Sequence, residues 1–355
     1  MRILVVGGGL AGTLASQVLR NQGAEVVGWW NGMPGASEVA AGMFNPVSFR
    51  RVVEVWDAAA HLEVALRVYR QIEHATGSTF LYPEVPILRV FPNADYRELW
   101  VEKMGERGGV ARWISLADPV PEGVVAPHGA GWVTGAGWVD VPALLKAWRA
   151  LPPERGGVLW EQRSWESEMG LPQGFNALVD ARGAGAREDL RRWEVPLNLN
   201  QGEVLTLGPA GWQPTWGLNK NQWILPVGDG HSRVGATYRW DLLENRIHPE
   251  VAEGMLQTLD GALSQPLPRK AVVAHQSGLR PVSPDRRPLV GIVHPERPWH
   301  WVFNGLGTRG VMVGPRAARD LATALLKPDA EAPKASSSVE IRRRARDLNP
   351  GRWRK

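Results

Sequence analysis

The chain has 355 residues, 44% of them hydrophobic and 22% charged, a composition typical of a globular protein with one large or two moderate cores. It has no cysteine, which excludes disulfides, iron–sulfur clusters and thiolate zinc sites, and its eight histidines form no HExxH motif, so we expect no metal. The net charge is +5, and basic residues are scattered until they gather in residues 340–355.

That basic stretch follows a polar segment that contains proline and serine, so we predict that residues 328–355 form a basic, disordered tail. A contact of this tail with a partner or with RNA is the alternative, and we do not expect nucleic acid to be a main partner. The N-terminal residues are apolar, but three consecutive glycines interrupt them, and no segment approaches about eighteen uninterrupted apolar residues. We therefore expect a soluble, cytoplasmic protein without a membrane span.

The first thirty residues predict a strand, a helix and a second strand. Residues 2–6 (RILVV) are a short apolar run bounded by glycine, typical of a strand inside a parallel sheet. Residues 11–22 carry apolar side chains at helical spacing, and Gly23 ends that helix. Residues 24–30 (AEVVGWW) form the second strand. This order predicts the start of a Rossmann-like α/β domain.

Helix-type and strand-type segments alternate along the rest of the chain. The expected elements are a helix at 61–77, a strand interrupted by prolines at 82–91, a loop and helix at 135–151 with Asp140 as N-cap, and a strand followed by small residues at 175–186. Strands of an antiparallel sheet follow at 202–207, 222–227 and 232–238, and the last two are joined by a hairpin turn. Residues 299–326 predict a strand, a glycine-rich loop and a helix. Nucleotide-type segments therefore recur at the beginning, middle and end, which predicts a discontinuous nucleotide-binding domain interleaved with a second α+β domain.

Gly7, Gly9 and Gly12 form a G-x-G-x-x-G motif between the first predicted strand and the first predicted helix. The first glycine permits a tight turn, the second lets the backbone approach a pyrophosphate, and the third allows close packing of helix and strand. The phosphates would then meet free N–H groups at the positive end of the helix. A glycine-rich packing turn without a ligand is the alternative.

The second strand ends without the acidic residue that usually binds the ribose hydroxyls. Trp30 occupies that position, and the neutral Asn31 follows it. One charged hydrogen bond contributes roughly 1.5–3 kcal/mol, so we expect the nucleotide site to be weakened and not abolished. Asn31 can still bond the ribose. No arginine follows the strand before Arg50, which disfavours a 2′-phosphate and therefore NADP.

Residues 36–51 (ASEVAAGMFNPVSFRR) come next, and here the sequence resembles the flavin-dependent D-amino-acid oxidase and glycine oxidase superfamily. In that family a loop of the type S-x-x-A-A-G-M lies along the flavin. Residues 277–291 (SGLRPVSPDRRPLVG) resemble the family's G-x-R-P-x-x-P-D-x-x-P element, whose arginine binds the substrate carboxylate. Residues 303–315 (FNGLGTRGVMVGP) resemble its glycine-rich loop against the flavin pyrimidine, although many members have G-H-x-x-x-G there.

The resemblance covers residues 1–326 and implies noncovalent FAD. The residues it assigns to the cofactor are Gly7, Gly9, Leu10, Ala11, Gly12, Asn31, Ala40, Ala41, Gly42, Met43, Gly305, Gly307, Thr308, Arg309, Gly310 and Val311. It also implies an FAD-binding domain made of 1–45, 131–190 and 276–327, and a substrate domain built on an antiparallel sheet from 46–130 and 191–275.

Three residues are predicted to bind substrate: Arg280, Tyr238 and Trp223. A planar guanidinium suits a carboxylate, and the prolines around Arg280 restrict its backbone. The alternative for Arg280 is a structural ion pair, for example with Asp285, and the two aromatic residues are alternatively part of the core. Arg309 faces the flavin or caps the following helix, and these two roles stay open.

The expected function is FAD-dependent oxidation of an amine or amino acid, with hydride transfer to the flavin and hydrolysis of the imine. A small-molecule amine or amino acid is the expected substrate, and the oligomeric state is left open. Three alternatives also stay open: a nicotinamide-dependent oxidoreductase, a non-catalytic flavin-binding relative, and a flavin module that acts on a modified RNA base.

Overall fold

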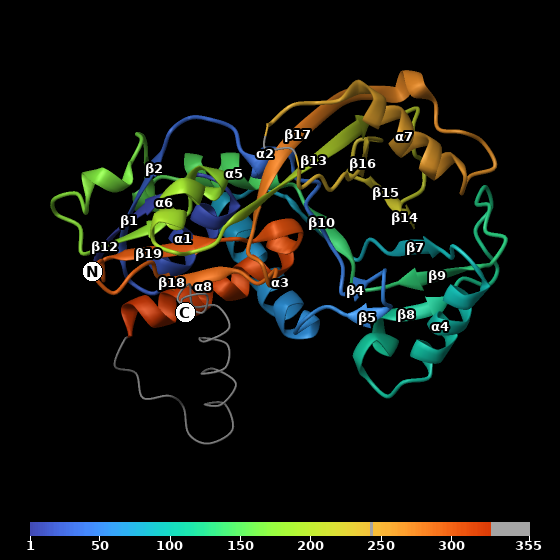
Figure 1. The fold of residues 1–355 in the computed structure, drawn as a ribbon, viewed down its shortest axis with the longest axis horizontal. Helices are drawn as coiled ribbons and strands as arrows, with labels where there is room; N and C mark the ends of the chain where they lie inside the picture. The colour runs from blue at the N-terminus through green and yellow to red at the C-terminus, as the bar shows by residue number, and fades with distance from the viewer. Residues whose placement is uncertain (242–243, 328–355) are drawn as a thin grey trace.

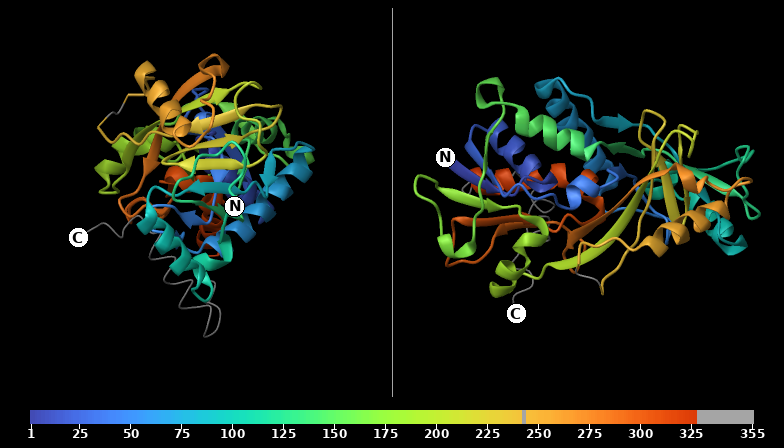
Figure 2. Two further views of the ribbon diagram at one scale, coloured as in Figure 1. Left: turned by 90° about the vertical axis from the view of Figure 1, so that its right-hand side faces the viewer. Right: turned by 90° about the horizontal axis from the view of Figure 1, so that it is seen from above.

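The computed structural model describes residues 1–241 and 244–327, and the predicted basic tail lies outside them. A six-stranded sheet lies at one end of the long axis of the molecule and an eight-stranded sheet at the other, with the longest strands reaching between them (Figure 1). Figure 2 shows the same separation from above. The fold is therefore α/β with a second, largely antiparallel part, as the sequence predicts.

The six-stranded sheet contains the expected βαβ opening. Its strands, in spatial order, are β11 (Leu159–Gln162), β2 (Glu25–Trp30), β1 (Arg2–Val6), β12 (Ala177–Asp180), β19 (His300–Asn304) and β18 (Leu289–Ile292). The first five are parallel, and only β18 runs antiparallel to its neighbour. The carboxyl ends of the parallel strands consequently lie at one edge, where ligands bind in open α/β sheets.

The eight-stranded sheet contains, in spatial order, β17 (Val272–Val282), β13 (Asn198–Leu207), β16 (Ser232–Gly235), β15 (Gln222–Pro226), β14 (Gly217–Lys220), β7 (Ile87–Val90), β9 (Ala130–Val133) and β8 (Ile114–Leu116). The predicted hairpin is confirmed, since β15 pairs with β16 in antiparallel register. Two small sheets complete the strands: β3 (Met43–Phe44) with β10 (Gly137–Val139) and β6 (Leu81–Pro83), and β4 (Val47–Ser48) with β5 (Val53–Glu54).

The α-helices are α1 (Leu10–Asn21), α2 (Ala36–Val39), α3 (Ala58–Thr76), α4 (Ala94–Met104), α5 (Val141–Ala150), α6 (Arg187–Arg192), α7 (Pro249–Asp260) and α8 (Gly310–Leu326). Short 3₁₀ turns occur at Gly109–Trp113, Pro153–Arg155, Ser167–Met169, Gly183–Ala186, Arg269–Ala271 and Gly307–Arg309. No helix among the described residues is both long enough and apolar enough to cross a bilayer.

Local signals explain where the predicted helices begin and end. The carboxylate of Asp140 accepts a 3.0 Å hydrogen bond from the Ala143 N–H and caps α5, as predicted. Helix α3 ends at Gly77, which has φ +68°, a left-handed conformation that glycine adopts without strain. Both ends therefore follow from residue type.

One predicted element is wrong. Residues 82–91 do not form a single strand, because β6 and β7 belong to different sheets. Pro83 is the last residue of β6 and Pro86 directly precedes β7, and a proline cannot donate to a ladder. The break carries the chain from the three-stranded sheet into the eight-stranded one.

The largest hydrophobic core lies between the six-stranded sheet and helices α1, α3, α5 and α8. A second core packs α7 against the eight-stranded sheet. The predicted domain boundaries place α3 with the substrate domain and residues from 131 on with the FAD-binding domain. These boundaries stay predictions. In the structure α3 packs against α8, and β9 pairs within the eight-stranded sheet.

Candidate active site

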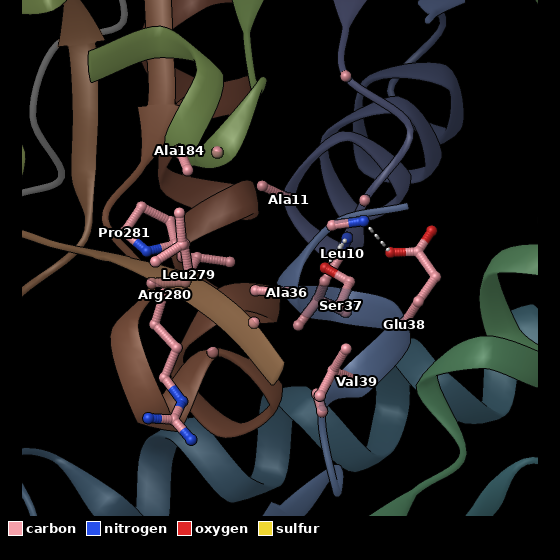
Figure 3. Close-up of a pocket in the computed structure, with 18 of the residues that line it drawn as sticks. Leu10, Ala11, Ala36, Ser37, Glu38, Val39, Ala184, Leu279, Arg280 and Pro281 are labelled. Carbon is pink, nitrogen blue, oxygen red and sulfur yellow. Dashed lines mark hydrogen bonds between the residues drawn. The ribbon is translucent and has the colours of Figure 1, made fainter. Parts of the chain in front are cut away.

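A cavity of about 530 Å³ lies where the two large sheets meet. Its wall combines the turn after β1, the end of β2, α2 and the turn that follows it, the start of α8, and side chains from β15 and β17. Figure 3 shows Leu10, Ser37 and Glu38 on one side of this space and Leu279, Arg280 and Pro281 on another. One continuous space thus borders both the predicted nucleotide-binding residues and the predicted substrate residues.

Most of the predicted site residues line this cavity. They are Gly7, Gly9, Leu10, Ala11, Asn31, Ala40, Ala41, Gly42, Met43, Trp223, Tyr238, Arg280, Gly307, Thr308, Gly310 and Val311. Gly12, Gly305 and Arg309 do not line it. Gly12 instead packs against the turn, Gly305 makes the bend after β19 at φ +67°, and Arg309 is exposed just before α8.

The turn after β1 can be built only with glycine. Gly7 has φ +111°, and a Cβ there would lie 2.4 Å from the carbonyl oxygen of Ala181. A Cβ on Gly12 would lie 1.7 Å from the carbonyl oxygen of Gly7, so helix and strand touch at that point. The first turn of α1 has no acidic residue, and its Leu10 N–H donates to Ser37 Oγ at 3.0 Å (Figure 3). This helix end suits a phosphate.

At the end of β2, an indole occupies the position where a carboxylate is usual. Trp30 lies against the glycine turn, since a Cβ on Gly8 would be 2.8 Å from Cγ of that ring. The guanidinium carbon of Arg149 lies 4.3 Å from the Trp30 ring centroid. Asn31 borders the cavity, but its Oδ1 already accepts the Met33 N–H at 3.1 Å.

Two arginines lie near the end of β2 in space, although none follows the strand in the sequence before Arg50. Arg149 comes from α5, and Arg163 follows β11 and places its guanidinium carbon 4.0 Å from the Trp29 ring centroid. The Arg163 N–H also donates to the Trp30 carbonyl at 2.9 Å. Both residues are far from β2 in the sequence, so a count along the chain after the strand misses them.

The opposite part of the cavity is held by buried hydrogen bonds at the start of α8. Asn304 is 1% exposed, donates from Nδ2 to the Gly183 carbonyl at 3.0 Å, and accepts the Gly305 N–H at 2.8 Å. The buried hydroxyl of Tyr69 donates to the Val311 carbonyl at 2.8 Å. These bonds tie the glycine-rich loop to β12 and to α3.

The small-residue turn after α2 lies against β10. Gly42 has φ +71°, and a Cβ there would lie 1.8 Å from the carbonyl oxygen of Val139. The carbonyl of Ala40 accepts a hydrogen bond from Arg233 on β16. Burial lowers the pKa of Arg233 from its ordinary value. The turn is thereby fixed between the three-stranded sheet and the eight-stranded sheet.

Arg280 projects from β17 into the cavity and is held by neutral groups. Its Nη1 donates to Asn200 Oδ1 at 3.0 Å and to the Thr237 carbonyl at 3.0 Å, and its guanidinium carbon lies 5.2 Å from the Tyr238 ring centroid. In the part of the chain that the structure describes, Arg280 forms no ion pair, so the alternative of a structural pair with Asp285 is not observed. Burial lowers the pKa of Arg280, but arginine stays protonated at neutral pH.

The two predicted aromatic residues border the same space differently. Trp223 packs over β16, where a Cβ on Gly235 would lie 2.7 Å from its Cζ2. Tyr238 is 57% exposed, so it is not a core residue. Tyr238 therefore borders the cavity with a solvent-exposed ring that contacts the Arg280 guanidinium.

A buried ion pair supports the wall at the end of β12. Asp180 is fully buried, and its Oδ2 lies 2.7 Å from Nη2 of Arg182, which also lies 2.7 Å from Asp189. Burial alone would raise the pKa of Asp180, but the charge of Arg182 outweighs it and holds that pKa far below its ordinary value. Arg182 lines the cavity with its position fixed by these carboxylates.

Sequence reasoning missed several residues of the site. Ser37 and Glu38 lie inside the small-residue motif, and that position is the sequence feature that could have identified them as site residues. Arg149, Asn200 and Gly202 have no local signal, because each acts on a residue more than 70 positions away. Among the described residues, no group of three or more His, Cys, Asp or Glu side chains could hold a metal ion.

A glycine turn after the first strand of a parallel sheet borders the same cavity as an arginine on an antiparallel sheet, an arrangement that indicates a nucleotide-dependent enzyme. A family model described as "FAD dependent oxidoreductase" (DAO) matches residues 2–324, so the chain belongs to this family of flavin enzymes. Its cofactor is FAD, and the nicotinamide alternative is dropped.

Two curated relatives are similar over about nine tenths of the chain. The tRNA 5-methylaminomethyl-2-thiouridine biosynthesis bifunctional protein MnmC of Azoarcus sp. is 27% identical over 91% of this chain, which spans only 56% of that protein. The glycine oxidase of Pseudomonas aeruginosa is 26% identical, with 90% of this chain and 93% of the relative covered.

Solved structures agree in fold. Glycine oxidase from Bacillus cereus has a TM-score of 0.73 at 20% identity, with 93% of this chain and 96% of that chain covered. L-proline dehydrogenase from P. horikoshii has a TM-score of 0.73 at 14% identity, with 99% and 97% covered.

The residues present fit FAD. The acid-free N-terminus of α1 faces the cavity at the glycine turn, where a pyrophosphate needs N–H donors and no competing charge. Gly42 and Gly307 also line the cavity, in the turn after α2 and at the start of α8, the two segments that would hold a flavin ring.

Proposed function

We propose that this enzyme oxidises an amine that carries a carboxylate, at the carbon next to the nitrogen. The observation that carries this proposal is Arg280, a partly buried guanidinium that borders the cofactor cavity and has only neutral partners among the described residues. A cation fixed in this way favours an anionic group of the substrate, because its charge is otherwise uncompensated. The glycine oxidase among the relatives supports the same class of reaction, because glycine is an amine that carries a carboxylate.

Arg280 would orient the substrate through its free edge. Asn200 and the Thr237 carbonyl occupy Nη1, which leaves Nε and Nη2 for the two oxygens of a carboxylate. When bound, FAD would supply the acceptor for a hydride from that carbon, and the lone pair of the neutral amine would form the C=N bond of an iminium ion, which water would hydrolyse to a carbonyl compound, the free amine and a proton. Trp223 and Tyr238 would border the rest of the substrate and keep bulk water from the reacting carbon.

The test compares Arg280→Lys and Arg280→Ala with the wild type. Lysine keeps the charge but loses the two-pronged fit, and alanine loses both. Removing one partner of a buried charged pair costs about 2–5 kcal/mol, so we expect kcat/KM to fall by about thirtyfold to several thousandfold for alanine. FAD content and melting temperature should hardly change.

A panel of glycine, sarcosine, D-amino acids and proline identifies the amine, and the corresponding amines without a carboxylate are the matched controls. Wild-type turnover of the amines without a carboxylate at equal kcat/KM would contradict the proposal. So would an Arg280→Ala enzyme that loses flavin and stability together and yet keeps its KM.

A further inference from the structure

The adenosine half of FAD carries two ribose hydroxyls, and the end of β2 offers them no carboxylate. Hydroxyl groups that leave water need acceptors, and an unpaired one costs about 1–3 kcal/mol. Trp30 presents carbon and an N–H donor, neither of which can accept. Among the described residues that line the cavity, only Glu38 and Glu166 carry carboxylates.

Glu38 is held beside Trp30 by a short chain of contacts. Its Oε1 lies 3.2 Å from Nη2 of Arg149, and the same guanidinium lies over the Trp30 ring at 4.3 Å. Its Oε2 accepts the Gly35 N–H at 2.9 Å. The side chains of Glu38 and Arg149 are only 26% and 18% exposed. The Arg149 guanidinium thus contacts both the partly buried carboxylate of Glu38 and Trp30, the residue that occupies the usual position of the ribose-binding acid.

The neighbouring residue connects Glu38 to the phosphate end. Ser37 Oγ on α2 accepts a 3.0 Å hydrogen bond from the Leu10 N–H, the first of α1, so α2 lies directly beside the glycine turn (Figure 3). Each carboxylate oxygen of Glu38 uses one hydrogen bond and can accept a second. Glu38 can therefore accept from a ligand without releasing Arg149 or Gly35.

We propose that Glu38 replaces the missing acid and accepts hydrogen bonds from the adenosine ribose of FAD. Arg149, stacked on Trp30, is the positioning residue that keeps the carboxylate in place. The acceptor has moved from the end of β2 to α2, and Trp30 serves as the platform for the guanidinium. The inference rests on FAD as the cofactor and is independent of the substrate proposed above.

The other acceptors fit less well. Glu166 is 69% exposed and lies 3.9 Å from Arg182, beside the end of β12 instead of β2. Asn31 is exposed and neutral, so the second lone pair that its Oδ1 keeps beside the Met33 N–H would give a weaker bond than a carboxylate oxygen. Glu166→Gln is consequently a matched control for loss of a carboxylate in the same cavity, and Asn31→Ala tests the competing acceptor.

The experiment measures displacement of FAD from the full-length protein by ADP, 2′-deoxy-ADP and 3′-deoxy-ADP, followed by the fluorescence of released flavin. A charged hydrogen bond is worth about tenfold or more in affinity, so the wild type should prefer ADP over at least one deoxy analogue by that factor. Glu38→Gln should reduce the preference to about threefold or less, since only a neutral bond is left. Arg149→Met should also reduce it, while Glu166→Gln and Asn31→Ala should keep it.

The preference compares two ligands on one protein, so a general loss of folding or affinity does not imitate the expected result. Trp30→Glu in the Glu38→Gln background should restore the preference, because it returns a carboxylate to the end of β2. A wild type without any preference, a Glu38→Gln protein that keeps it, or its loss in Asn31→Ala would each overturn the assignment. Because no amine is present, the test is separate from that of the proposed function.

Discussion

Gly202 on β13 controls the position of Arg280, and replacing it with alanine tests this directly. A Cβ at Gly202 would lie 1.9 Å from Nη2, 2.0 Å from Cζ and 2.0 Å from Nη1 of Arg280. Contacts this short force the guanidinium to move, since Cβ atoms essentially never come within 3.0 Å of such a neighbour. Gly202 has no positive φ, so the backbone accepts alanine without strain.

The expected effect is a loss of function without a loss of folding. The atoms that clash are the flexible end of one side chain, and replacing glycine by alanine at a compatible position stabilises a protein by about 0.4–1 kcal/mol. A displacement of about 1 Å in a positioning group can cost about a hundredfold in rate. We therefore expect kcat/KM for the carboxylate-bearing amine to fall by about a hundredfold, with FAD binding and melting temperature close to those of the wild type.

Steady-state kinetics, flavin content and thermal unfolding on one preparation provide the measurement. Gly254→Ala on α7 is the control, because a Cβ there meets no atom within 4 Å. Binding of acetate, followed through the flavin absorbance, gives a reading of the carboxylate site without turnover. Unchanged acetate affinity and unchanged kcat/KM in Gly202→Ala would show that Arg280 does not need its observed position, and the carboxylate anchor would have to lie elsewhere.

Two further changes test the supports of the cavity. Asp180→Asn should lower the free energy of unfolding by about 3 kcal/mol at neutral pH, because Arg182 stays buried with one carboxylate fewer. The pKa of Asp180 is lowered in the folded state, so its contribution is complete above about pH 4 and declines only as the pH falls further; equal stability of variant and wild type at pH 7 would contradict this. Asn304→Ala leaves the Gly183 carbonyl and the Gly305 N–H without their partner and should cost about 2–3 kcal/mol in urea unfolding, with flavin released at a lower urea concentration. Loss of flavin at the wild-type urea midpoint would argue against a link between Asn304 and the cofactor site.

The elements that could be predicted are those with local causes. The glycine turn after β1, the cap at Asp140 and the hairpin between β15 and β16 each depend on residues within a few positions of one another. The prediction of a single strand at 82–91 was wrong because sheet membership is decided by partners far along the chain. Strand β6 pairs with β10, and β7 pairs with β9 and β14. Hydrophobic periodicity and strand propensity do not indicate which strands pair with each other.

The candidate site divides in the same way. Arg280 could be found because the prolines and glycine around it form a local pattern. The atoms that fix its guanidinium could not, since Asn200 and Gly202 belong to β13 and meet β17 only in the folded sheet. Arg163 likewise reaches β2 through strand pairing with β11. Such residues become visible only when the register of the sheets is known.

The end of β2 shows why a missing motif residue is weak ground for rejecting a site. Trp30 fits beside the glycine turn because residue 8 has no side chain, and its ring then supports a guanidinium from α5. That guanidinium pairs with the carboxylate of Glu38 on α2, so a carboxylate and a guanidinium are both present although neither comes directly after β2 in the sequence. What a ribose requires is an acceptor at a point in space, and three segments of the chain meet at this point. The departure at Trp30 is therefore better tested by exchanging the acceptor than by restoring the family residue alone.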